Sequence, residues 1–254
     1  MMYDITKQVI SQKQLIMNIA LIGYGKMGHE IESIALKRGH LIKLIVDKDN
    51  ENDLNSANLR GIDVAIEFSL PAAAFNNIIQ CLVENVPVVS GTTGWLDRYN
   101  EVVSICNKNK TAFIHSSNYS IGVNLFYRLN TELAKQMERY HDYKVSIEEI
   151  HHIKKLDAPS GTAITLAEAI VDQHSGYKKW CYVDDKTELC IPIHSIREGD
   201  VPGTHTVTWD SEIDTISLKH VAKNRKGLAL GAVVAAEFIQ SRKGVFTIND
   251  VMGF

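Results

Sequence analysis

Three glycines at fixed spacing, Gly23, Gly25 and Gly28, constrain the fold of this chain more than any other feature. A short apolar run over residues 18–22 precedes them, and residues 31–38 follow with the apolar spacing of a helix. Glycine permits a tight turn and the close approach of a phosphate, and a helix N-terminus attracts negative charge. We therefore expect a strand, a phosphate-binding turn and a helix. The residues expected to contact a dinucleotide here are Gly23, Gly25, Lys26, Met27 and Gly28.

The alternation of strand and helix patterns continues to about residue 118. Further strands are predicted at residues 41–46, 64–68, 87–89 and 112–115. Helices are predicted between them at residues 71–84 and 96–108. This order indicates an α/β fold with a Rossmann-like, doubly wound parallel sheet, in which residues 41–46 are expected to form a buried strand.

Asp47 ends the second predicted strand, where an acidic residue accepts hydrogen bonds from the adenosine ribose in dinucleotide-binding folds. Lys48 follows directly, and its charge would offset the repulsion between Asp47 and the 2′-phosphate of NADP. A solvated surface lysine explains Lys48 equally well. The sequence therefore leaves both NADH and NADPH open, and a glycine turn that binds nothing is the alternative to the motif as a whole.

The pattern changes after Asn118, where an amphipathic stretch over residues 123–140 is followed by alternating segments. Strands are predicted at residues 143–150, 191–196, 204–209 and 213–220, and an apolar helix at 228–239. Closely spaced strands without helices between them indicate a smaller α+β domain with a mixed or antiparallel sheet. We expect residues 1–120 and 222–254 to form the dinucleotide-binding domain, and residues 121–221 to form the substrate-binding and oligomerisation domain.

Composition excludes several classes of protein. The 254 residues include 45% hydrophobic and 22% charged residues, which is ordinary for a globular protein and excludes disordered and fibrous classes. With a net charge of −3 and no run of Lys and Arg, a nucleic-acid-binding face is not expected. Apolar runs stay well short of the ~20 residues of a membrane span.

Four cysteines are scattered without the spacing of a metal site. They are Cys81, Cys106, Cys181 and Cys190. We interpret them as reduced thiols, which favours a cytosolic location. Residues 1–16 lack the apolar region of a secretory signal. Because the first strand begins at Met17, these residues are expected to be a frayed arm or to precede the true start codon, and we favour the latter.

A second group of reactive residues lies between residues 148 and 163. It contains His151, His152, Lys154, Lys155 and the turn formed by residues 160–162, which begins a helix pattern. Lysine charge, backbone N–H groups at a helix start and imidazole proton donors would together suit an anionic substrate. Each residue alone is a weak signal, because adjacent histidines on a strand point to opposite faces and Lys154 is accounted for by solvation.

This second group resembles the substrate signature of the dihydrodipicolinate reductase family. The similarity rests on His-His-x-x-Lys at residues 151–155, followed by Asp-Ala-Pro-Ser-Gly-Thr-Ala at residues 157–163. Residues 91–94 resemble the family's nicotinamide-side loop, and residues 117–124 resemble its interdomain hinge. The resemblance covers nearly everything after Met17 and includes residues 197–200, 203–205 and 231–233. The glycine loop is one residue shorter than in the longer bacterial members, and residues 176–193 are abbreviated.

The resemblance implies reduction of 4-hydroxy-tetrahydrodipicolinate to tetrahydrodipicolinate in diaminopimelate and lysine biosynthesis. NADH, NADPH or both would supply hydride, no metal would be needed, and the enzyme would be a cytoplasmic homotetramer. His151 corresponds to the catalytic proton donor or acceptor, and Lys155 to a second proton donor. Substrate-binding residues would be His152, Ser160, Gly161 and Thr162. Cofactor-binding residues would include Asp47, Gly91, Thr92, Thr93, Ser117, Asn118 and Tyr119.

Two other functions remain open from the residues alone. The first is another dehydrogenase of the aspartate or sugar type, because a fold does not fix the substrate. The second is a dinucleotide-binding protein without catalysis. The pairing of His-His-x-x-Lys with Pro-Ser-Gly-Thr disfavours the first, and the presence of His151 and Lys155 disfavours the second.

Overall fold

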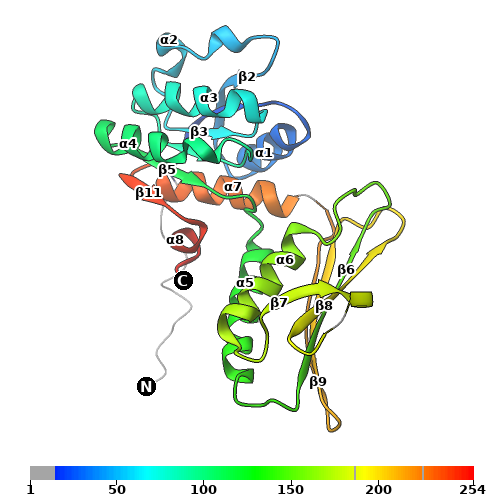
Figure 1. The fold of residues 1–254 in the computed structure, drawn as a ribbon. Helices are drawn as coiled ribbons and strands as arrows, with labels where there is room; N and C mark the ends of the chain where they lie inside the picture. The colour runs from blue at the N-terminus through cyan, green and yellow to red at the C-terminus, as the bar shows by residue number, and fades with distance from the viewer. Residues whose placement is uncertain (1–14, 186, 225) are drawn as a thin grey trace, which may run out of the picture. The chain divides into compact units, whose positions relative to one another are not determined.

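A computed structural model describes residues 15–185, 187–224 and 226–254 (Figure 1). The predicted N-terminal extension lies outside the described residues except for Leu15 and Ile16, which are both exposed. The chain divides into two compact units. The first contains the described residues through Ser117 together with Ala232–Thr247, and the second contains Asn118–Gly231 and Ile248–Phe254. These limits differ from the predicted domains, which assigned residues 118–120, 222–231 and 248–254 to the first part.

The first unit is built on a six-stranded parallel sheet with the order β11-β5-β4-β3-β1-β2. Its strands are β1 (Asn18–Ile22), β2 (Leu41–Val46), β3 (Val64–Glu67), β4 (Val88–Ser90), β5 (Ala112–His115) and β11 (Gly244–Phe246). The predicted Rossmann-like sheet is confirmed. Strand β11 was not predicted from the sequence, because three residues are too few to show a periodic pattern.

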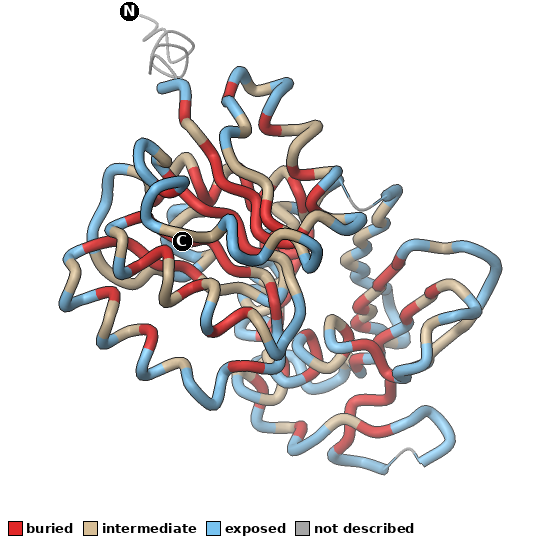
Figure 2. The backbone as a smooth tube through the Cα atoms, turned by 90° about the horizontal axis from the view of Figure 1, so that it is seen from above, coloured by how far each residue is buried: buried red, intermediate tan, exposed pale blue. Residues whose placement is uncertain are grey.

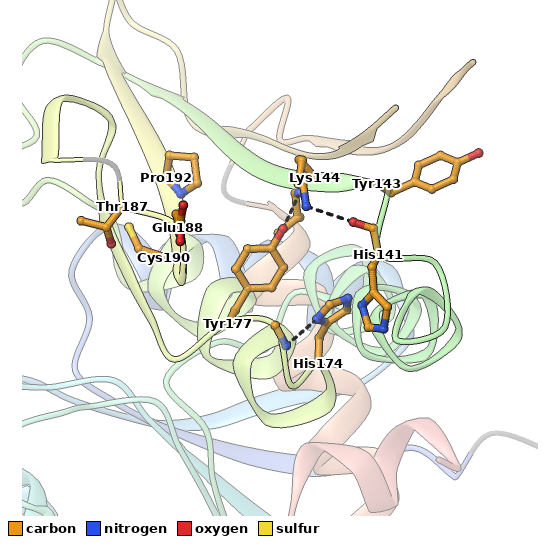
Figure 3. A pocket seen from close by; sticks show the side chains of 11 residues that line it. His141, Tyr143, Lys144, His174, Tyr177, Thr187, Glu188, Cys190 and Pro192 are labelled. Carbon is orange, nitrogen blue, oxygen red and sulfur yellow. Dashed lines mark hydrogen bonds between the residues drawn. The ribbon is translucent and has the colours of Figure 1, made fainter. Parts of the chain in front are cut away.

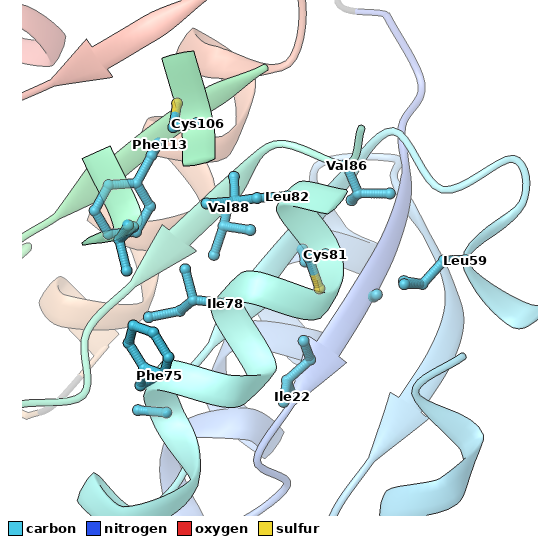
Figure 4. Close-up of a cluster of buried hydrophobic side chains, with 14 of the residues drawn as sticks. Ile22, Leu59, Phe75, Ile78, Cys81, Leu82, Val86, Val88, Cys106 and Phe113 are labelled. Atoms are coloured by element: carbon cyan, nitrogen blue, oxygen red, sulfur yellow. The ribbon is translucent and has the colours of Figure 1, made fainter. Parts of the chain in front are cut away.

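Helices connect the parallel strands, as crossover connections require. They are α1 (Lys26–Lys37), α2 (Ser56–Leu59), α3 (Pro71–Val83) and α4 (Tyr99–Asn109), with short 3₁₀ turns at Glu51–Asp53 and Leu96–Arg98. Helix α7 (Lys226–Ile239) precedes β11, and its residues are divided between the two units after Gly231. Pro71 begins α3, where its missing N–H leaves no bond unmade. Phe75, Ile78 and Leu82 follow at helical spacing and pack into the core (Figure 4).

The second strand differs from its prediction. We expected residues 41–46 to be buried, but only Val46 in β2 is buried, and Leu41 is 43% exposed. The reason is that β2 forms one edge of the sheet, so it has a single neighbour, β1. Central strands such as β3 are buried along their whole length (Figure 2).

The second unit contains a five-stranded mixed sheet with the order β10-β9-β6-β8-β7. Its strands are β6 (Lys144–His151), β7 (Lys179–Tyr182), β8 (Cys190–Arg197), β9 (Thr204–Asp210) and β10 (Thr215–Val221). Strands β6, β8 and β7 run parallel, whereas β9 runs antiparallel to both β6 and β10. The predicted mixed sheet is confirmed, and β7 is an additional edge strand.

Helices α5 (Ile121–Met137) and α6 (Gly161–Gln173) lie along one side of this sheet (Figure 1), and a short helix α8 (Ile248–Met252) ends the unit. A core of Ile147, Leu166, Ile170 and the fully buried Trp209 joins the helices to the strands. Alternate residues of β6 are buried and exposed, as in a sheet covered on one face. None of the helices among the described residues has the length and apolar character needed to cross a membrane.

The expectation of four reduced thiols is wrong for one pair. Cys181 in β7 and Cys190 in β8 form a disulfide, with 5.9 Å between their Cα atoms. The two residues are nine positions apart in sequence, and the pairing of β7 with β8 brings them into bonding range. Cys81 and Cys106 are free and buried, as expected.

Candidate active site

The glycine turn between β1 and α1 forms the first part of the site. Gly23 has a positive φ of 90°, and a Cβ added there would lie 2.1 Å from the carbonyl oxygen of Phe68. A Cβ on Gly28 would lie 2.5 Å from the carbonyl oxygen of Gly23. By contrast, a Cβ on Gly25 would meet nothing within 4 Å. Gly23 and Gly28 are therefore required by packing, whereas Gly25 keeps the surface before α1 open.

A cavity of about 250 Å³ lies beside this turn. Its lining comprises Ile22, Gly23, Gly25, Val46, Asp47, Lys48, Glu51, Phe68, Ser69, Leu70, Ala73 and Asn77. The backbone N–H of Asp47 donates to Oδ1 of Asn50 at 2.7 Å, which holds the turn after β2. Glu51 adds a second carboxylate that sequence analysis missed, although an acid four residues after Asp47 was a visible signal. Two acids and one lysine thus face the end of the cavity expected for the ribose.

A buried carboxylate organises the loops after β3 and β4. Glu67 has no exposed surface, and its Oε1 accepts hydrogen bonds from the N–H of Ser69 at 2.9 Å and the hydroxyl of Thr92 at 2.8 Å. Its Oε2 accepts from the hydroxyl of Ser90 at 2.7 Å. The Thr92 hydroxyl therefore donates its hydrogen bond to Glu67 within the protein. Glu67 was not among the predicted site residues, although an acidic residue that ends an otherwise apolar strand is a visible signal.

The other predicted cofactor residues are spread over several places. Lys26 and Met27 form the first turn of α1 outside the cavity lining, and the loop that follows β4 begins with Gly91, Thr92 and Thr93. The described segment after β5 contains Ser117, which is exposed, Asn118 and Tyr119. Tyr119 is 1% exposed, and its carbonyl lies so close to Gly231 that a Cβ there could not fit.

In the second unit, strand β6 places chemistry on its inward face. Val145 and Ile147 are buried on that face, and Glu149 and His151 continue the same alternation at the end of the strand. Glu149 has no exposed surface and His151 is 7% exposed. Glu148 is on the opposite, exposed face. Two polar side chains thus replace apolar ones where the strand reaches the site.

The Glu149 carboxylate has a different environment at each oxygen. Oε1 accepts a hydrogen bond from the N–H of Ser160 at 3.1 Å and lies 3.0 Å from Nη2 of Arg197. Oε2 lies 2.7 Å from Nδ1 of His151 and 3.9 Å from Nε2 of His205. Burial alone would raise the pKa of Glu149, but hydrogen bonds with neighbouring hydroxyl and guanidinium groups and the charge of His151 hold it below its usual value. Glu149 is therefore ionised.

Three histidines of the second unit favour the neutral form, and two of them, His151 and His205, lie beside Glu149. Burial lowers the pKa of His151 against the opposing effect of Glu149, and the positive charge of Lys155 lowers it further. Burial and the neighbouring His151 lower the pKa of His205 to about 4, and its Nε2 lies 3.1 Å from the Ser160 hydroxyl. Burial also lowers the pKa of His220. All three rings are thus uncharged near neutral pH.

These rings surround a second cavity, of about 180 Å³. Its lining comprises Asn118, Ser120, Val123, His151, Thr162, Pro202, Gly203, His205, His220, Ala222, Asn224, Gly227 and Leu228. Gly203 has a φ of 155°, and a Cβ there would lie 3.1 Å from Nε2 of His151. The absence of a side chain at Gly203 therefore leaves the Nε2 edge of His151 open.

The structure brings together some of the predicted substrate residues and adds others. His151 and Thr162 line the 180 Å³ cavity together with His205 and His220, which sequence analysis did not select. The remaining four are close in sequence but outside that lining: Lys155, His152, Ser160 and Gly161. The missed histidines lie on β9 and β10, and only the antiparallel pairing of those strands aligns them.

The residues outside the lining have defined local roles. Nζ of Lys155 pairs with the Asp157 carboxylate at 2.8 Å. Ser160 caps α6, because its hydroxyl accepts a hydrogen bond from the N–H of Ala163, and Gly161 is the first residue of that helix. His152 is half-buried just beyond the end of β6.

Glu149, His151 and His205 also offer donor atoms within 4.8 Å of one another, the arrangement of a metal site. The guanidinium of Arg197 beside Glu149 already compensates the carboxylate, and it would oppose a bound cation. The prediction that the reaction needs no metal stays a prediction.

A larger cavity, of about 710 Å³, lies elsewhere in the second unit (Figure 3). It is lined by His141, Lys144, His174 and Tyr177, among other residues. It adjoins the start of β6, whereas His151 ends that strand. None of the predicted site residues lines this cavity, so it is not the site predicted from the sequence.

Both halves of the chain match the same family of known proteins. Residues 17–119 match the family described as dihydrodipicolinate reductase, N-terminus, and residues 122–252 match dihydrodipicolinate reductase, C-terminus. The chain is 56% identical over 237 residues to 4-hydroxy-tetrahydrodipicolinate reductase of Christiangramia forsetii, covering 93% of this chain and 98% of the relative. It is 35% identical to the enzyme of that name from Thermosipho africanus, with the same coverage of each chain.

The fold is also that of a solved structure, dipicolinate-bound dihydrodipicolinate reductase from Paenisporosarcina sp. TG-14. The TM-score is 0.77 and the sequence identity 24%, with 92% of this chain and 98% of the other covered. Both halves of the chain match one family, and the relatives extend over nearly the whole sequence. The chain therefore belongs to the dihydrodipicolinate reductase family.

Proposed function

We propose that this protein reduces (2S,4S)-4-hydroxy-2,3,4,5-tetrahydrodipicolinate to 2,3,4,5-tetrahydrodipicolinate with NADH or NADPH. The observation that carries the proposal is His151, which lines the 180 Å³ cavity and lies beside an ionised Glu149, in a chain 56% identical to an enzyme of that name. The reaction belongs to diaminopimelate and lysine biosynthesis.

The first unit suits the dinucleotide. The turn that ends at Gly25 leaves space for a pyrophosphate, and the N–H groups of the first turn of α1 face that space without acceptors from within the helix. Asp47 is positioned to accept hydrogen bonds from a ribose. When bound, the nicotinamide would supply the hydride. We assign cofactor binding to the first unit and substrate binding to the second.

The second unit supplies groups for proton transfer. Reduction with net loss of water adds a hydride and a proton to the substrate skeleton, so an acid–base group must stand beside the reacting carbons. His151 is neutral and its Nε2 edge faces the cavity, which suits it to accept and return a proton. Lys155 is an ammonium held by Asp157 and serves as a second proton donor.

The substrate carboxylates require donors as well as charge. The N-terminus of α6 offers the backbone N–H groups of Gly161 and Thr162, and the side chain of Thr162 lines the cavity. His152 adds an imidazole just beyond His151. We assign these three residues and Ser160 to substrate binding, with Ser160 acting through its cap on α6.

We also propose a homotetramer that assembles through the second unit. The face of the mixed sheet opposite α5 and α6 carries exposed residues along β6, and most of β10 is exposed. Val221 on β10 belongs to that face and is 52% exposed, which leaves apolar surface for a neighbouring subunit. Sedimentation equilibrium should give four times the chain mass of 28.4 kDa. A monomer at micromolar concentration would contradict this assembly.

The decisive experiment follows oxidation of NADH and NADPH in the presence of substrate generated enzymatically. We expect rapid oxidation that depends on the substrate. Replacing His151 or Lys155 with alanine should lower turnover by roughly 10²-fold or more, with NADH affinity nearly constant. His152→Ala should chiefly raise KM.

Two outcomes would point elsewhere. Oxidation with an aspartate or sugar substrate alone would favour another dehydrogenase, and cofactor binding without any turnover would favour a non-catalytic protein. A lower melting temperature with preserved turnover for both His151→Ala and Lys155→Ala would remove the assigned mechanism but leave the reductase activity.

A further inference from the structure

Glu149 is fully buried at the end of β6, on a face otherwise lined by apolar residues such as Val145 and Ile147. Burying a carboxylate in its ionised form is costly unless it is paired and hydrogen-bonded. Arg197 and the N–H of Ser160 provide that compensation at one oxygen, Oε1, and the hydroxyl groups of Ser160 and Ser195 also lower the pKa of the carboxyl. The ion-pair contacts of the second oxygen, Oε2, among the described residues are with imidazole rings.

Oε2 faces imidazole rings. It lies 2.7 Å from Nδ1 of His151, within ion-pair distance but outside hydrogen-bond geometry, and neither of these two atoms has a hydrogen-bond partner among the described residues. A second ring nitrogen, Nε2 of His205, lies 3.9 Å from the same oxygen. His205 has a separate partner, the Ser160 hydroxyl at 3.1 Å. One oxygen of the Glu149 carboxylate thus contacts Arg197 and Ser160, and the other contacts His151.

The charge on Glu149 determines where the proton of His151 resides. An ionised carboxylate only accepts hydrogen bonds, so a neutral imidazole beside it keeps its proton on the nearer nitrogen, Nδ1. The lone pair is then on Nε2. A Cβ on Gly203 would lie 3.1 Å from Nε2, and both residues line the 180 Å³ cavity, so this nitrogen is the one that meets a substrate.

We propose that Glu149 is the positioning residue for His151, which it holds with Nδ1–H toward Oε2 and the Nε2 lone pair toward the substrate cavity. This inference rests on the proposed function, in which His151 transfers a proton. In that role Glu149 also stabilises the imidazolium that forms when Nε2 accepts a proton, because the carboxylate is already in place.

Cationic groups around His151 disfavour its protonation, and the Glu149 carboxylate offsets their effect. Lys155 and Arg197 both disfavour a positive charge on His151, and the ring of His205 stacks edge-on at 5.0 Å. Glu149 is the group that favours the charge. Without it, protonation of Nε2 would place a cation beside two others in a buried site.

The first experiment measures the tautomer of His151 in the substrate-free enzyme, by NMR of protein labelled with ¹⁵N-histidine. Signals are assigned by their loss in His151→Asn. We expect Nδ1–H in the wild type near neutral pH. In Glu149→Gln the amide oxygen should remain with Arg197 and the N–H of Ser160, so the amide NH₂ faces Nδ1 and the proton moves to Nε2.

The second experiment measures steady-state kinetics. Glu149→Gln should lower kcat by roughly 10²-fold with KM little changed, as expected when a proton-transfer group is held in the wrong tautomer. Glu148→Gln is the matched control, because Glu148 is next in sequence, on the opposite face and exposed. It should behave like the wild type. The double variant Glu149→Gln, His151→Ala should be no slower than His151→Ala.

Several results would overturn the inference. A wild-type His151 with its proton on Nε2 would do so whether or not Glu149→Gln folds. So would unchanged turnover and tautomer in Glu149→Gln, or an additional loss of kcat in the double variant, which would indicate a purely structural role. A tautomer that changes on treatment with a chelator would assign Oε2 to a cation instead. If the wild type shows no reductase activity, the proposed function fails while the NMR result still tests the position of Glu149.

Discussion

Single residues determine the chemistry of both candidate sites through burial. Glu67 and Glu149 are each fully buried carboxylates at the end of a strand, and each fixes groups on neighbouring segments. The Glu67 carboxylate accepts hydrogen bonds from hydroxyl and N–H donors. The Glu149 carboxylate instead pairs with the guanidinium of Arg197 and lies beside His151. The same residue type thus supports a loop in one unit and proton transfer in the other.

The lowered pKa of His205 predicts a pH dependence of stability. The folded value is about 4 and the ordinary value 6.5, so between these limits the unfolded chain binds a proton that the folded chain does not. The free energy of unfolding should therefore fall as pH decreases from about 6.5 toward about 4, by at most about 1.4 kcal/mol per pH unit from this residue.

Urea denaturation at about pH 7 and about pH 5 measures this effect. His205→Gln should show a smaller loss of stability between the two pH values than the wild type does. His151, His174 and His220 also have lowered pKa values, so part of the pH dependence should remain in the variant. An identical loss in both proteins would contradict the assignment to His205.

Asp47 predicts the cofactor preference. Together with Glu51 it places two carboxylates at the cavity, which would repel the 2′-phosphate of NADPH, while the exposed Lys48 offsets part of that repulsion. NADH should therefore serve at least as well as NADPH, and Asp47→Ala should shift the preference toward NADPH. The measurement is kcat/KM with each cofactor, and a more than roughly tenfold preference of the wild type for NADPH would contradict it.

At the scale of elements, the turn before α1 contains glycines with two different roles. Gly28 is required for packing, whereas Gly25 is expected to be required only for cofactor binding. Gly28→Ala would place a Cβ 2.5 Å from the carbonyl of Gly23, so it should lower the free energy of unfolding by roughly 1–3 kcal/mol. Gly25→Ala meets nothing in the free protein and should leave the melting temperature nearly unchanged. It should nevertheless weaken NADH binding by about tenfold or more, because the methyl group occupies the space of the pyrophosphate.

Calorimetric titration with NADH and thermal melts of both variants test this pair. The informative comparison is Gly25→Ala, since its effect should appear only when the dinucleotide is added. Wild-type affinity in Gly25→Ala would show that the cofactor does not approach this turn.

At the scale of the whole molecule, the two units have separate hydrophobic cores. Changes in one ligand site should therefore leave the other site intact. Gly25→Ala should bind the proposed substrate as tightly as the wild type does, and His151→Ala should bind NADH normally. Binding titrations of each variant with both ligands check this. Loss of both ligands in either variant would show that the sites do not form independently.

The sequence alone predicted most of the architecture. The spacing of glycines and the alternation of strands and helices identified the parallel sheet, and the residue pattern after Asn118 identified the mixed sheet. The exceptions are short or peripheral: β11 and β7 were missed, β2 proved to be an edge strand, and Cys181 and Cys190 were not expected to pair. Strand order, which determines edges and neighbours, is not encoded in local periodicity.

For the candidate site, local sequence determined which reactive groups exist, because motifs such as residues 151–155 and 160–162 are continuous in the chain. Tertiary structure decided which of them meet. His205 and His220 reach the cavity of His151 only through strand pairing, and Arg197 reaches Glu149 from β8. The charge state of each group follows from burial and from neighbours distant in sequence, so the proton position on His151 depends on the fold and not on the motif that contains it.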